Sequence, residues 1–591
     1  MAKIKVSDYI AKRLKELGVE HFFMVSGGGA MHLNDSLGRE LSYTAHHHEQ
    51  ACAFAAEGYA RVEQKLAVVN VTAGPGGLNC LNGVFGQWTD SVPVLYLSGQ
   101  VKRQTMKDDS ISNLRQLGDQ EVDIVSCVKG ITKYACCVKE PNEIKYHLDK
   151  AIFEATNGRF GPCWLDIPID VQASVIDENE LVDFVPKEKK EQVSDNVLSF
   201  VIKKLKNAKA PLIVAGHGIR LSGMQKVFAT LVEDLKIPVV TTFNGFDMLN
   251  SDNPYYIGRI GSLGQRAGNF ALQNADVILF LGTRNNVRQV SYNWENFAPN
   301  AYKIIVDIDK EELEKPLVKP DYPICVDLKA FLPMLKEFVN SCEKLEWVNF
   351  CSKLKNKYSF VNHKENVQKE DVIEPYHFTY ALTKSLNQDD IFIMANGSAC
   401  VCTFQNAVVK EGQRFILNSG DASMGFALPA AIGARFSNPN KRVICLEGDG
   451  SIMMNLQELQ TVVHNNLPIK LFVINNSGYS SIRQTQRNFF NGHMTGSGID
   501  SGVSVPDFVA IAKAFGLNAF KIRNPKTMDD EIKRVLEFSG PVLCEVMVEQ
   551  EYNFAPKLSA RRLDDRTMVS PTLEDMSPFL DRDEMMGCRY E

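Results

Sequence analysis

Asp449 and Asn476 each stand directly after an apolar run, in RVICLEGDG (442–450) and IKLFVINN (469–476). Two such runs separated by an amphipathic segment predict a strand–helix–strand unit. Because the crossover in such a unit is right-handed, both strands end at the same sheet edge, where open α/β sheets bind ligands. A carboxylate and an amide oxygen there suit Mg²⁺ or Ca²⁺, whose remaining positions can take phosphate oxygens and water. The pair therefore predicts a metal site for a phosphorylated cofactor; ordinary turns at GDG and NNSG are the alternative.

A single helix is expected between these two strands, in SIMMNLQELQTVVHNN (451–466). Its apolar side chains recur with helical spacing at Ile452, Leu456, Leu459 and Val463. This face would cover the sheet and hold the two strand ends in place.

Short apolar runs alternate with helix-length amphipathic runs along the whole chain, for example LAVVNVT, APLIVAG, ADVILFLG and PVLCEVMV. Near-continuous apolar strands between helices indicate parallel sheets covered on both faces. Charged stretches at 177–196 and 353–375 separate three blocks of domain size. We therefore predict an α/β protein of three tandem parallel-sheet domains, at 1–185, 190–345 and 370–550.

The two ends of the chain differ in character. The first residues predict an amphipathic helix with Val6, Ile10, Leu14 and Leu17 on one face. Residues 551–591 predict an arm over the body of the protein, with isolated apolar anchors at Phe554, Leu573, Met576 and Phe579.

Composition excludes several classes of protein. The chain has 591 residues, with 65 basic and 71 acidic side chains interspersed and a net charge of -6. This balance provides no basic footprint for nucleic acid. No signal peptide and no apolar stretch long enough for a membrane span are present in the sequence, so we expect a cytoplasmic protein. The 14 cysteines form no CxxC pair, which favours buried free thiols over a metal finger.

The GDG and NN motifs, Gly448-Asp449-Gly450 and Asn475-Asn476, resemble the signature of thiamine-diphosphate enzymes of the acetolactate synthase and pyruvate oxidase type. The resemblance extends over about residues 3 to 550 and implies thiamine diphosphate and Mg²⁺ as cofactors. It implies that Asp449, Asn476 and the carbonyl of Gly478 bind Mg²⁺, which grips the diphosphate. The other cofactor-binding positions it implies are Thr72, Pro75, Asn79, Gly397, Ser398, Ser423, Met424, Gly448, Gly450, Ser451, Tyr479 and Ser480.

The same resemblance implies two catalytic residues, Glu49 in HHHEQACAFAAEGYAR and Gln120 in RQLGDQEVD. Glu49 would hydrogen-bond the aminopyrimidine of the cofactor and favour the tautomer that removes the thiazolium proton. The plain alternative for Glu49 is a surface charge at a helix start. His46, His47 and His48 cannot all face one metal, because consecutive residues point in different directions; one of them, His48, could line the pocket.

Resemblance also implies a homodimer or homotetramer with the active site between subunits. Glu49 and Asp449 would then come from different chains. A 2-keto acid and a carbonyl acceptor would be the small-molecule partners.

The resemblance to acetolactate synthases also implies an FAD site in the middle domain, at Gly216, Gly218, Arg288, Asp307 and Asp309. Glycines at strand ends would let a nucleotide diphosphate approach the backbone. However, the acidic residues that often precede the arginine in the family are Asn286 and Val287 here. Another adenine nucleotide, or a vestigial fold without a ligand, are the alternatives.

Two positions depart from acetolactate synthase where the acceptor would bind. Thr485 stands at the place of a tryptophan, and Asp119 at that of a phenylalanine. A more polar and open acceptor pocket would favour a hydroxylated carbonyl, such as a keto sugar, over a second pyruvate. We therefore predict decarboxylation of a 2-keto acid, with pyruvate as the expected donor, and carboligation to a polar carbonyl acceptor. The alternatives are acetolactate synthase proper, simple decarboxylation to an aldehyde, and a catalytically silent regulatory subunit, against which the intact Glu49 and Asp449 argue.

Overall fold

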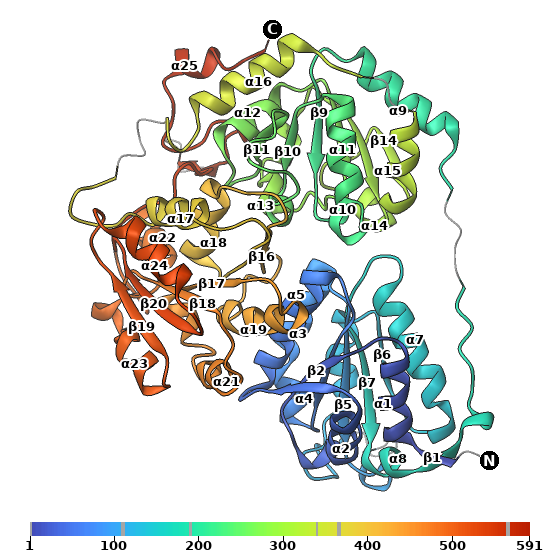
Figure 1. Ribbon diagram of the computed structural model, residues 1–591. Helices are drawn as coiled ribbons and strands as arrows, with labels where there is room; N and C mark the ends of the chain where they lie inside the picture. The colour runs from blue at the N-terminus through green and yellow to red at the C-terminus, as the bar shows by residue number, and fades with distance from the viewer. Residues whose placement is uncertain are drawn as a thin grey trace.

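Three six-stranded sheets form the framework of the protein (Figure 1). The computed structural model describes residues 3–107, 113–187, 192–338, 341–362, 368–562 and 568–590. Every neighbouring pair of strands within these sheets is parallel, and most strand residues are buried. The predicted fold class, three tandem α/β domains, is confirmed.

The first sheet has the order β3-β2-β4-β5-β7-β6. Its strands are β2 (His21–Met24), β3 (Ser42–Ala45), β4 (Ala67–Val71), β5 (Val94–Gln100), β6 (Tyr134–Cys137) and β7 (Cys163–Pro168). The helices of this domain are α1 (Val6–Glu16), α2 (Met31–Glu40), α3 (Glu49–Glu63), α4 (Pro75–Asn79), α5 (Leu81–Asp90), α6 (Ile124–Val128), α7 (Ile144–Thr156) and α8 (Ile169–Ala173). A separate antiparallel pair joins β1 (Lys3–Lys5) to β8 (Val175–Asp177).

The third sheet has the order β16-β15-β17-β18-β20-β19, which is the connectivity of the first sheet. Its strands are β15 (Ile391–Met394), β16 (Arg414–Leu417), β17 (Val443–Gly448), β18 (Lys470–Asn475), β19 (Asn518–Ile522) and β20 (Val542–Met547). The helices of this domain are α17 (Pro375–Lys384), α18 (Gly397–Asn406), α19 (Ala427–Ser437), α20 (Asp449–Ile452), α21 (Glu458–His464), α22 (Ser480–Phe489), α23 (Phe508–Ala514) and α24 (Met528–Glu537). The chain reverses direction across the sheet between β15 and β17, which opens a crevice for a ligand at their carboxyl ends.

The middle sheet has a different order, β11-β10-β9-β12-β13-β14, with its reversal between β9 and β12. Its strands are β9 (Pro211–Ala215), β10 (Val239–Thr241), β11 (Tyr256–Arg259), β12 (Val277–Leu281), β13 (Tyr302–Asp307) and β14 (Tyr322–Cys325). The helices of this domain are α9 (Asp195–Asn207), α10 (Gly218–Leu221), α11 (Gln225–Leu235), α12 (Arg266–Asn274), α13 (Val287–Val290), α14 (Lys310–Glu314), α15 (Leu328–Glu337) and α16 (Leu345–Lys357).

Helices α3 and α19 join the first domain to the third. A Cβ atom on Gly58 would lie 2.0 Å from the carbonyl oxygen of Ala430, and one on Gly433 would lie 1.8 Å from that of Ala55. Only glycine allows two helix backbones to approach this closely. The contact brings the start of α3, where Glu49 lies, to the third domain of the same chain.

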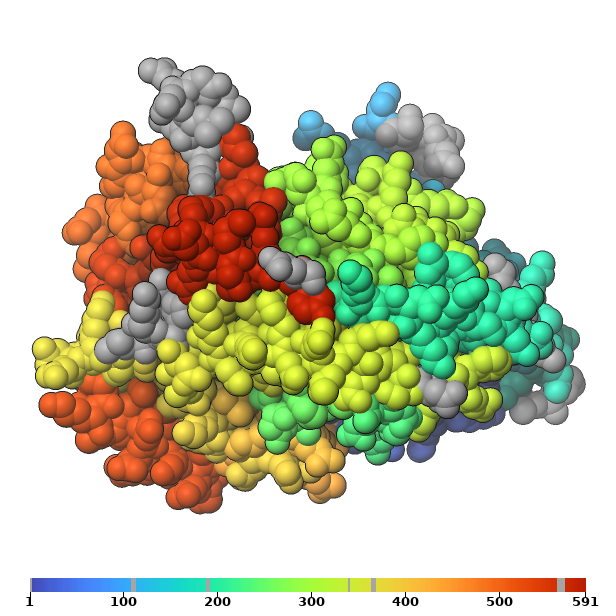
Figure 2. Space-filling view, turned by 90° about the horizontal axis from the view of Figure 1, so that it is seen from above, coloured from blue at the N-terminus to red at the C-terminus, as the bar shows by residue number. Residues whose placement is uncertain are grey.

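The C-terminal arm lies against both the middle and the third domains (Figure 2). It contains β21 (Arg561–Arg562), β22 (Met568–Val569) and α25 (Arg582–Met586). Asn269 of α12 donates to the carbonyl of Leu573 at 3.0 Å, and Arg266 donates to that of Met576 at 3.2 Å. Phe554, Leu573 and Met576 are buried as predicted. Phe579 is 42% exposed, so the prediction that it is a buried anchor was wrong.

Two helix predictions need correction. Leu17 is 44% exposed, because α1 ends at Glu16 and only its earlier apolar residues are buried. The segment after Asp449 forms two short helices, α20 and α21, and not one. Asn455, between them, donates its side-chain N–H to the carbonyl of Gly425 at 2.9 Å, which holds the chain in a turn. Among the described residues, none of the helices has the length and apolar character needed to cross a membrane.

Candidate active site

The carboxylate of Asp449 lies at the strand reversal of the third sheet, at the start of α20. Only 1% of the residue is exposed. Its oxygens accept backbone N–H groups from Gly450 at 2.7 Å, Asn476 at 2.9 Å and Gly478 at 3.0 Å. Burial raises the pKa of Asp449 to about 6, while these backbone donors lower it. The carboxylate is therefore held in one orientation across the ends of β17 and β18.

The two asparagines of the NN motif face different surroundings. Asn475 donates to the Glu545 carboxylate at 2.7 Å and accepts from the backbone N–H of Ser477 at 3.0 Å. Asn476 donates to Ser398 Oγ at 3.4 Å, and its buried Oδ1 has no partner among the described residues. A buried acceptor is normally paired, so an unpartnered oxygen beside a carboxylate fits a cation. The structure therefore brings Asp449 and Asn476 together at the ends of the two strands, as the strand–helix–strand prediction expects.

Arg483, on α22, shapes the turn that follows Asn476. Its guanidinium donates to the carbonyls of Asn476 at 2.7 Å and Ser477 at 3.1 Å. Gly478 completes the turn with a φ of 119°, a conformation that favours glycine. Arg483 is not among the residues predicted from the sequence, where its only signal is an arginine in the segment that follows NNSG.

Several predicted cofactor residues surround Asp449. Ser398 lies in the first turn of α18, which Gly397 enters with a φ of 62°. Ser451 Oγ accepts the N–H of Gly425 at 2.9 Å, so the segment after β16 lies against α20. The ring of Tyr479 lies over Gly450, where a Cβ atom would be 2.3 Å from it. Four more of the predicted cofactor-binding residues lie next to these residues in the chain: Ser423, Met424, Gly448 and Ser480.

A second group of predicted residues gathers in the first domain, around the start of α3. Asn79 donates to Glu49 Oε2 at 2.9 Å. A Cβ atom on Gly76 would lie 3.6 Å from Glu49 Oε1, so the start of α4, where Pro75 lies, faces the same carboxylate. Thr72 Oγ1 accepts the N–H of Gly29 at 3.0 Å just before this helix.

Gln120 approaches this group through its backbone. The residue is exposed and has a φ of 61°. Its carbonyl oxygen would lie 2.4 Å from a Cβ atom on Gly74, in the loop that precedes α4. The Glu121 carboxylate closes the Gln120 loop by accepting N–H groups from Leu117 at 2.9 Å and Gly118 at 3.1 Å.

A buried pair, His46 and Glu458, ties the start of α3 to α21. His46 Nδ1 lies 2.7 Å from Glu458 Oε2, and the other carboxylate oxygen accepts the N–H of His47 at 3.0 Å. Burial raises the pKa of Glu458, but the hydrogen bond and charge of His46 lower it further, so that it lies below its ordinary value. His48 accepts the N–H of Gln50 at 3.2 Å and caps the helix. Sequence analysis missed Glu458, because its partner is distant in the sequence.

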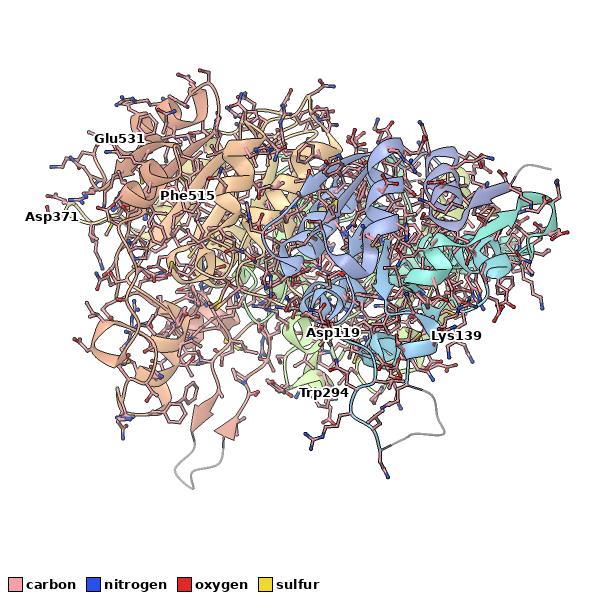
Figure 3. All side chains as sticks on the ribbon, turned by 90° about the horizontal axis from the view of Figure 1, so that it is seen from below. Asp119, Lys139, Trp294, Asp371, Phe515 and Glu531 are labelled. Carbon is pink, nitrogen blue, oxygen red and sulfur yellow. The ribbon has the colours of Figure 1, made fainter. Side chains whose placement is uncertain are left out.

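The two positions that depart from the family are both at the surface of the single chain. Thr485 is exposed and donates to the carbonyl of Ser481 at 3.1 Å, within its own helix. Asp119, labelled in Figure 3, is exposed on the loop before α6. That these two residues line one acceptor pocket stays a prediction. That Glu49 and Asp449 of one active site come from different subunits also stays a prediction.

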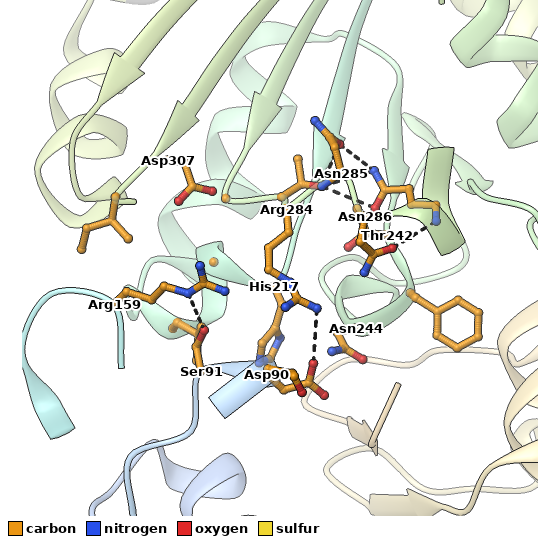
Figure 4. A pocket seen from close by; sticks show the side chains of 18 of the residues that line it. Asp90, Ser91, Arg159, His217, Thr242, Asn244, Arg284, Asn285, Asn286 and Asp307 are labelled. Atoms are coloured by element: carbon orange, nitrogen blue, oxygen red, sulfur yellow. Dashed lines mark hydrogen bonds and ion pairs between the residues drawn. The ribbon is translucent and has the colours of Figure 1, made fainter. Parts of the chain in front are cut away.

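A large pocket opens at the carboxyl ends of the middle-domain strands β9, β10, β12 and β13 (Figure 4). It contains about 1090 Å³ of empty space, part of it open to solvent. Gly218, Arg288 and Asp307 line it, as do Arg159 of the first domain and Arg284. This position at the reversal of the sheet is where doubly wound sheets bind nucleotides.

The charged side chains around this pocket are largely paired with other groups of the protein. Burial raises the pKa of Asp307 to about 6, and its carboxylate accepts the backbone N–H of Asp309 at 3.0 Å. Arg288 lies 4.8 Å from the ring centre of Phe243 and donates to the carbonyl of Ser419 at 3.3 Å. Arg159 pairs with Asp309 and Glu312, and Arg284 pairs with Asp90 at 3.8 Å.

Two predicted residues of the middle domain have other partners. A Cβ atom on Gly216 would lie 2.1 Å from the carbonyl oxygen of Gly282, so this glycine serves the packing of two strand ends. The Asp309 carboxylate pairs with Arg159 at 2.7 Å and accepts the N–H of Glu311 at 3.0 Å. Neither residue belongs to the described lining of the pocket.

Comparison with known proteins gives consistent matches along the chain. Three models of thiamine pyrophosphate enzymes match: the N-terminal TPP binding domain at residues 4–126, the central domain at 198–335 and the C-terminal TPP binding domain at 395–546. An acetolactate synthase large subunit from Lactococcus lactis is 34% identical over 95% of this chain and 96% of its own length. The isozyme 2 large subunit of Escherichia coli is 30% identical over 93% of this chain and 96% of its own length.

Proposed function

Because the chain belongs to the thiamine pyrophosphate enzymes of the acetolactate synthase type, we propose that it decarboxylates a 2-keto acid and joins the acyl unit to a carbonyl acceptor. Pyruvate is the proposed donor, and a polar carbonyl such as a keto sugar is the proposed acceptor. The observation that supports this most is the buried Asp449 carboxylate, fixed by backbone donors beside the unpartnered oxygen of Asn476.

Each group of residues has a proposed task. Asp449, Asn476 and the Gly478 carbonyl would hold Mg²⁺, with Ser398 and Ser451 close by for the diphosphate. Thiamine diphosphate, when bound, supplies a ring that accepts the electron pair released on decarboxylation. Glu49, oriented by Asn79, would hold a proton at the aminopyrimidine nitrogen. Gln120, on the loop that reaches Gly74, would orient the substrate.

The acceptor proposal rests on Thr485 and Asp119, both polar and exposed. Its strongest competitor is acetolactate synthesis, because the relatives carry that name. The protein should be incubated with pyruvate, thiamine diphosphate, Mg²⁺ and a panel of carbonyl acceptors, and the products identified by mass. We expect a product that contains a polar acceptor, and we expect Thr485→Trp to lower its yield relative to acetolactate. Acetolactate as the sole product would overturn the acceptor proposal, and free aldehyde alone would indicate simple decarboxylation.

We further propose FAD as the ligand of the middle-domain pocket, and a homodimer or homotetramer as the active assembly. The size of the pocket and its place at the strand reversal of the middle sheet support a nucleotide as the ligand. Flavin absorbance in the purified protein, and FAD released on denaturation, are the expected results. Protein that carries no extractable flavin and does not bind added FAD would contradict this proposal. A cytoplasmic location stays a prediction from the sequence.

A further inference from the structure

We propose that Tyr552, from the chain segment that begins the C-terminal arm, is a further residue that binds the diphosphate of the cofactor. This inference rests on the proposed function of the Asp449 and Asn476 site. The sequence predicted only that the arm covers the body of the protein. The inference gives the arm a residue that binds the cofactor directly.

The hydroxyl of Tyr552 already lies among the predicted diphosphate-binding groups. It forms a hydrogen bond with Ser398 Oγ, which in turn accepts from Asn476 Nδ2 at 3.4 Å. Burial raises the pKa of the Tyr552 phenol, the charge of Asp449 contributes to the rise, and hydrogen bonds to Ser398 and Ser480 oppose it. The phenol therefore contacts the start of α18 directly and lies close enough to α20 for the charge of Asp449 to act on it.

Packing contacts also hold the ring of Tyr552 in position. Tyr552 makes an edge contact with Phe554, with ring centres 5.9 Å apart. Both rings belong to a small apolar cluster that Val401 and Cys402 of α18 complete. Tyr376, in the same cluster, anchors the arm separately, because its hydroxyl accepts the N–H of Ala555 at 3.0 Å.

A neutral hydroxyl at this place suits a diphosphate. A tyrosine phenol is protonated at neutral pH, so the hydroxyl beside Ser398 can donate a hydrogen bond to a phosphate oxygen. Hydrogen bonds to charged oxygens are the stronger ones in proteins. The ring would also shield the phosphate and Mg²⁺ from water on the side of the arm.

The test compares Tyr552→Phe with the wild type by calorimetric titration of the full-length, cofactor-free protein with thiamine diphosphate at saturating Mg²⁺. Phenylalanine keeps the ring and removes only the hydroxyl. We expect the dissociation constant to rise about tenfold or more, as for loss of a hydrogen bond to a charged group. We expect the thermal unfolding temperature of the cofactor-free variant to match that of the wild type.

Tyr376→Phe is the matched control, because it removes a hydroxyl of the same cluster whose partners, Gln405 and the N–H of Ala555, are not predicted diphosphate-binding groups. It should leave cofactor affinity within about twofold of the wild type, because no contact to the site is removed. An unchanged or tighter affinity in Tyr552→Phe, or equal weakening in both variants, would overturn the proposal. A wild type that binds no thiamine diphosphate under these conditions would instead refute the proposed function on which it rests.

Discussion

Asn475 and Asn476 are neighbours in the sequence, yet their side chains serve different purposes. Asn475 bridges to the buried Glu545 and stabilises the sheet edge, whereas Asn476 presents an unpartnered oxygen beside Asp449. A strand alternates its side chains between two faces, so a pair of identical residues at its end is divided between the two environments. This division allows the structural and the ligand-binding roles to be separated by mutation.

Asn476→Ala should lose cofactor affinity without losing stability. We expect Mg²⁺-dependent binding of thiamine diphosphate to weaken by more than about tenfold, since even indirect changes around a metal cost 10–100-fold in affinity. Asn475→Ala, the matched control, should lower the free energy of unfolding by about 1–3 kcal/mol, because it leaves the Glu545 carboxylate short of a buried partner. Calorimetric titration and denaturant unfolding of both variants check this. Equal loss of affinity in the two variants would argue against a ligand role for Asn476.

Residues at strand ends were the ones that sequence analysis could place. The apolar runs before Asp449 and Asn476 predict where each strand stops, and parallel topology then brings the ends together. Arg483 and Glu458 were missed because their partners are chosen by tertiary packing. Asp309 was expected at a nucleotide and is instead paired with Arg159 of another domain, which no local pattern reveals.

At the scale of elements, the break between α20 and α21 brings the first and third domains into contact. The turn places Asn455 against Gln50 at 3.0 Å and directs Glu458 toward His46 at 2.7 Å. Helical spacing of apolar residues predicted a continuous helix, because the periodicity of a buried face persists through a short turn. The break positions the start of α3, and hence Glu49, through two side-chain contacts.

Glu458→Gln tests this connection through its pH dependence. The pKa of Glu458 is lowered in the folded state, below its ordinary value of 4.5, so the ionised carboxylate contributes stability above that pH. That contribution is lost as the pH falls through the folded-state pKa. We expect the variant to be about 1–3 kcal/mol less stable at neutral pH, with the difference shrinking as the pH falls below 4.5.

Thermal unfolding of wild type and Glu458→Gln across this pH range measures the effect. Glu537→Gln, at an exposed position at the end of α24, is the control and should change little at any pH. A stability difference between wild type and Glu458→Gln that does not depend on pH would show that the charge of Glu458 is not what stabilises the contact.

At the scale of the whole molecule, two domains of identical connectivity flank one of different connectivity. The continuous apolar strands were sufficient to predict three parallel sheets, since such strands must be covered on both faces. They could not predict strand order, the close packing of α3 on α19, or which anchors of the arm are buried. Those features depend on contacts between distant segments, such as Gly58 against Ala430.

Release of CO₂ from carboxyl-labelled pyruvate is the measurement that tests the central claim most directly. We expect the wild type to release label only when thiamine diphosphate and Mg²⁺ are both supplied. Glu49→Gln should still bind the cofactor but release CO₂ at least about 100-fold more slowly, the effect of losing a positioned acid–base group. A wild type that releases no CO₂ from any 2-keto acid tested, or a Glu49→Gln variant with an unchanged rate, would contradict the account.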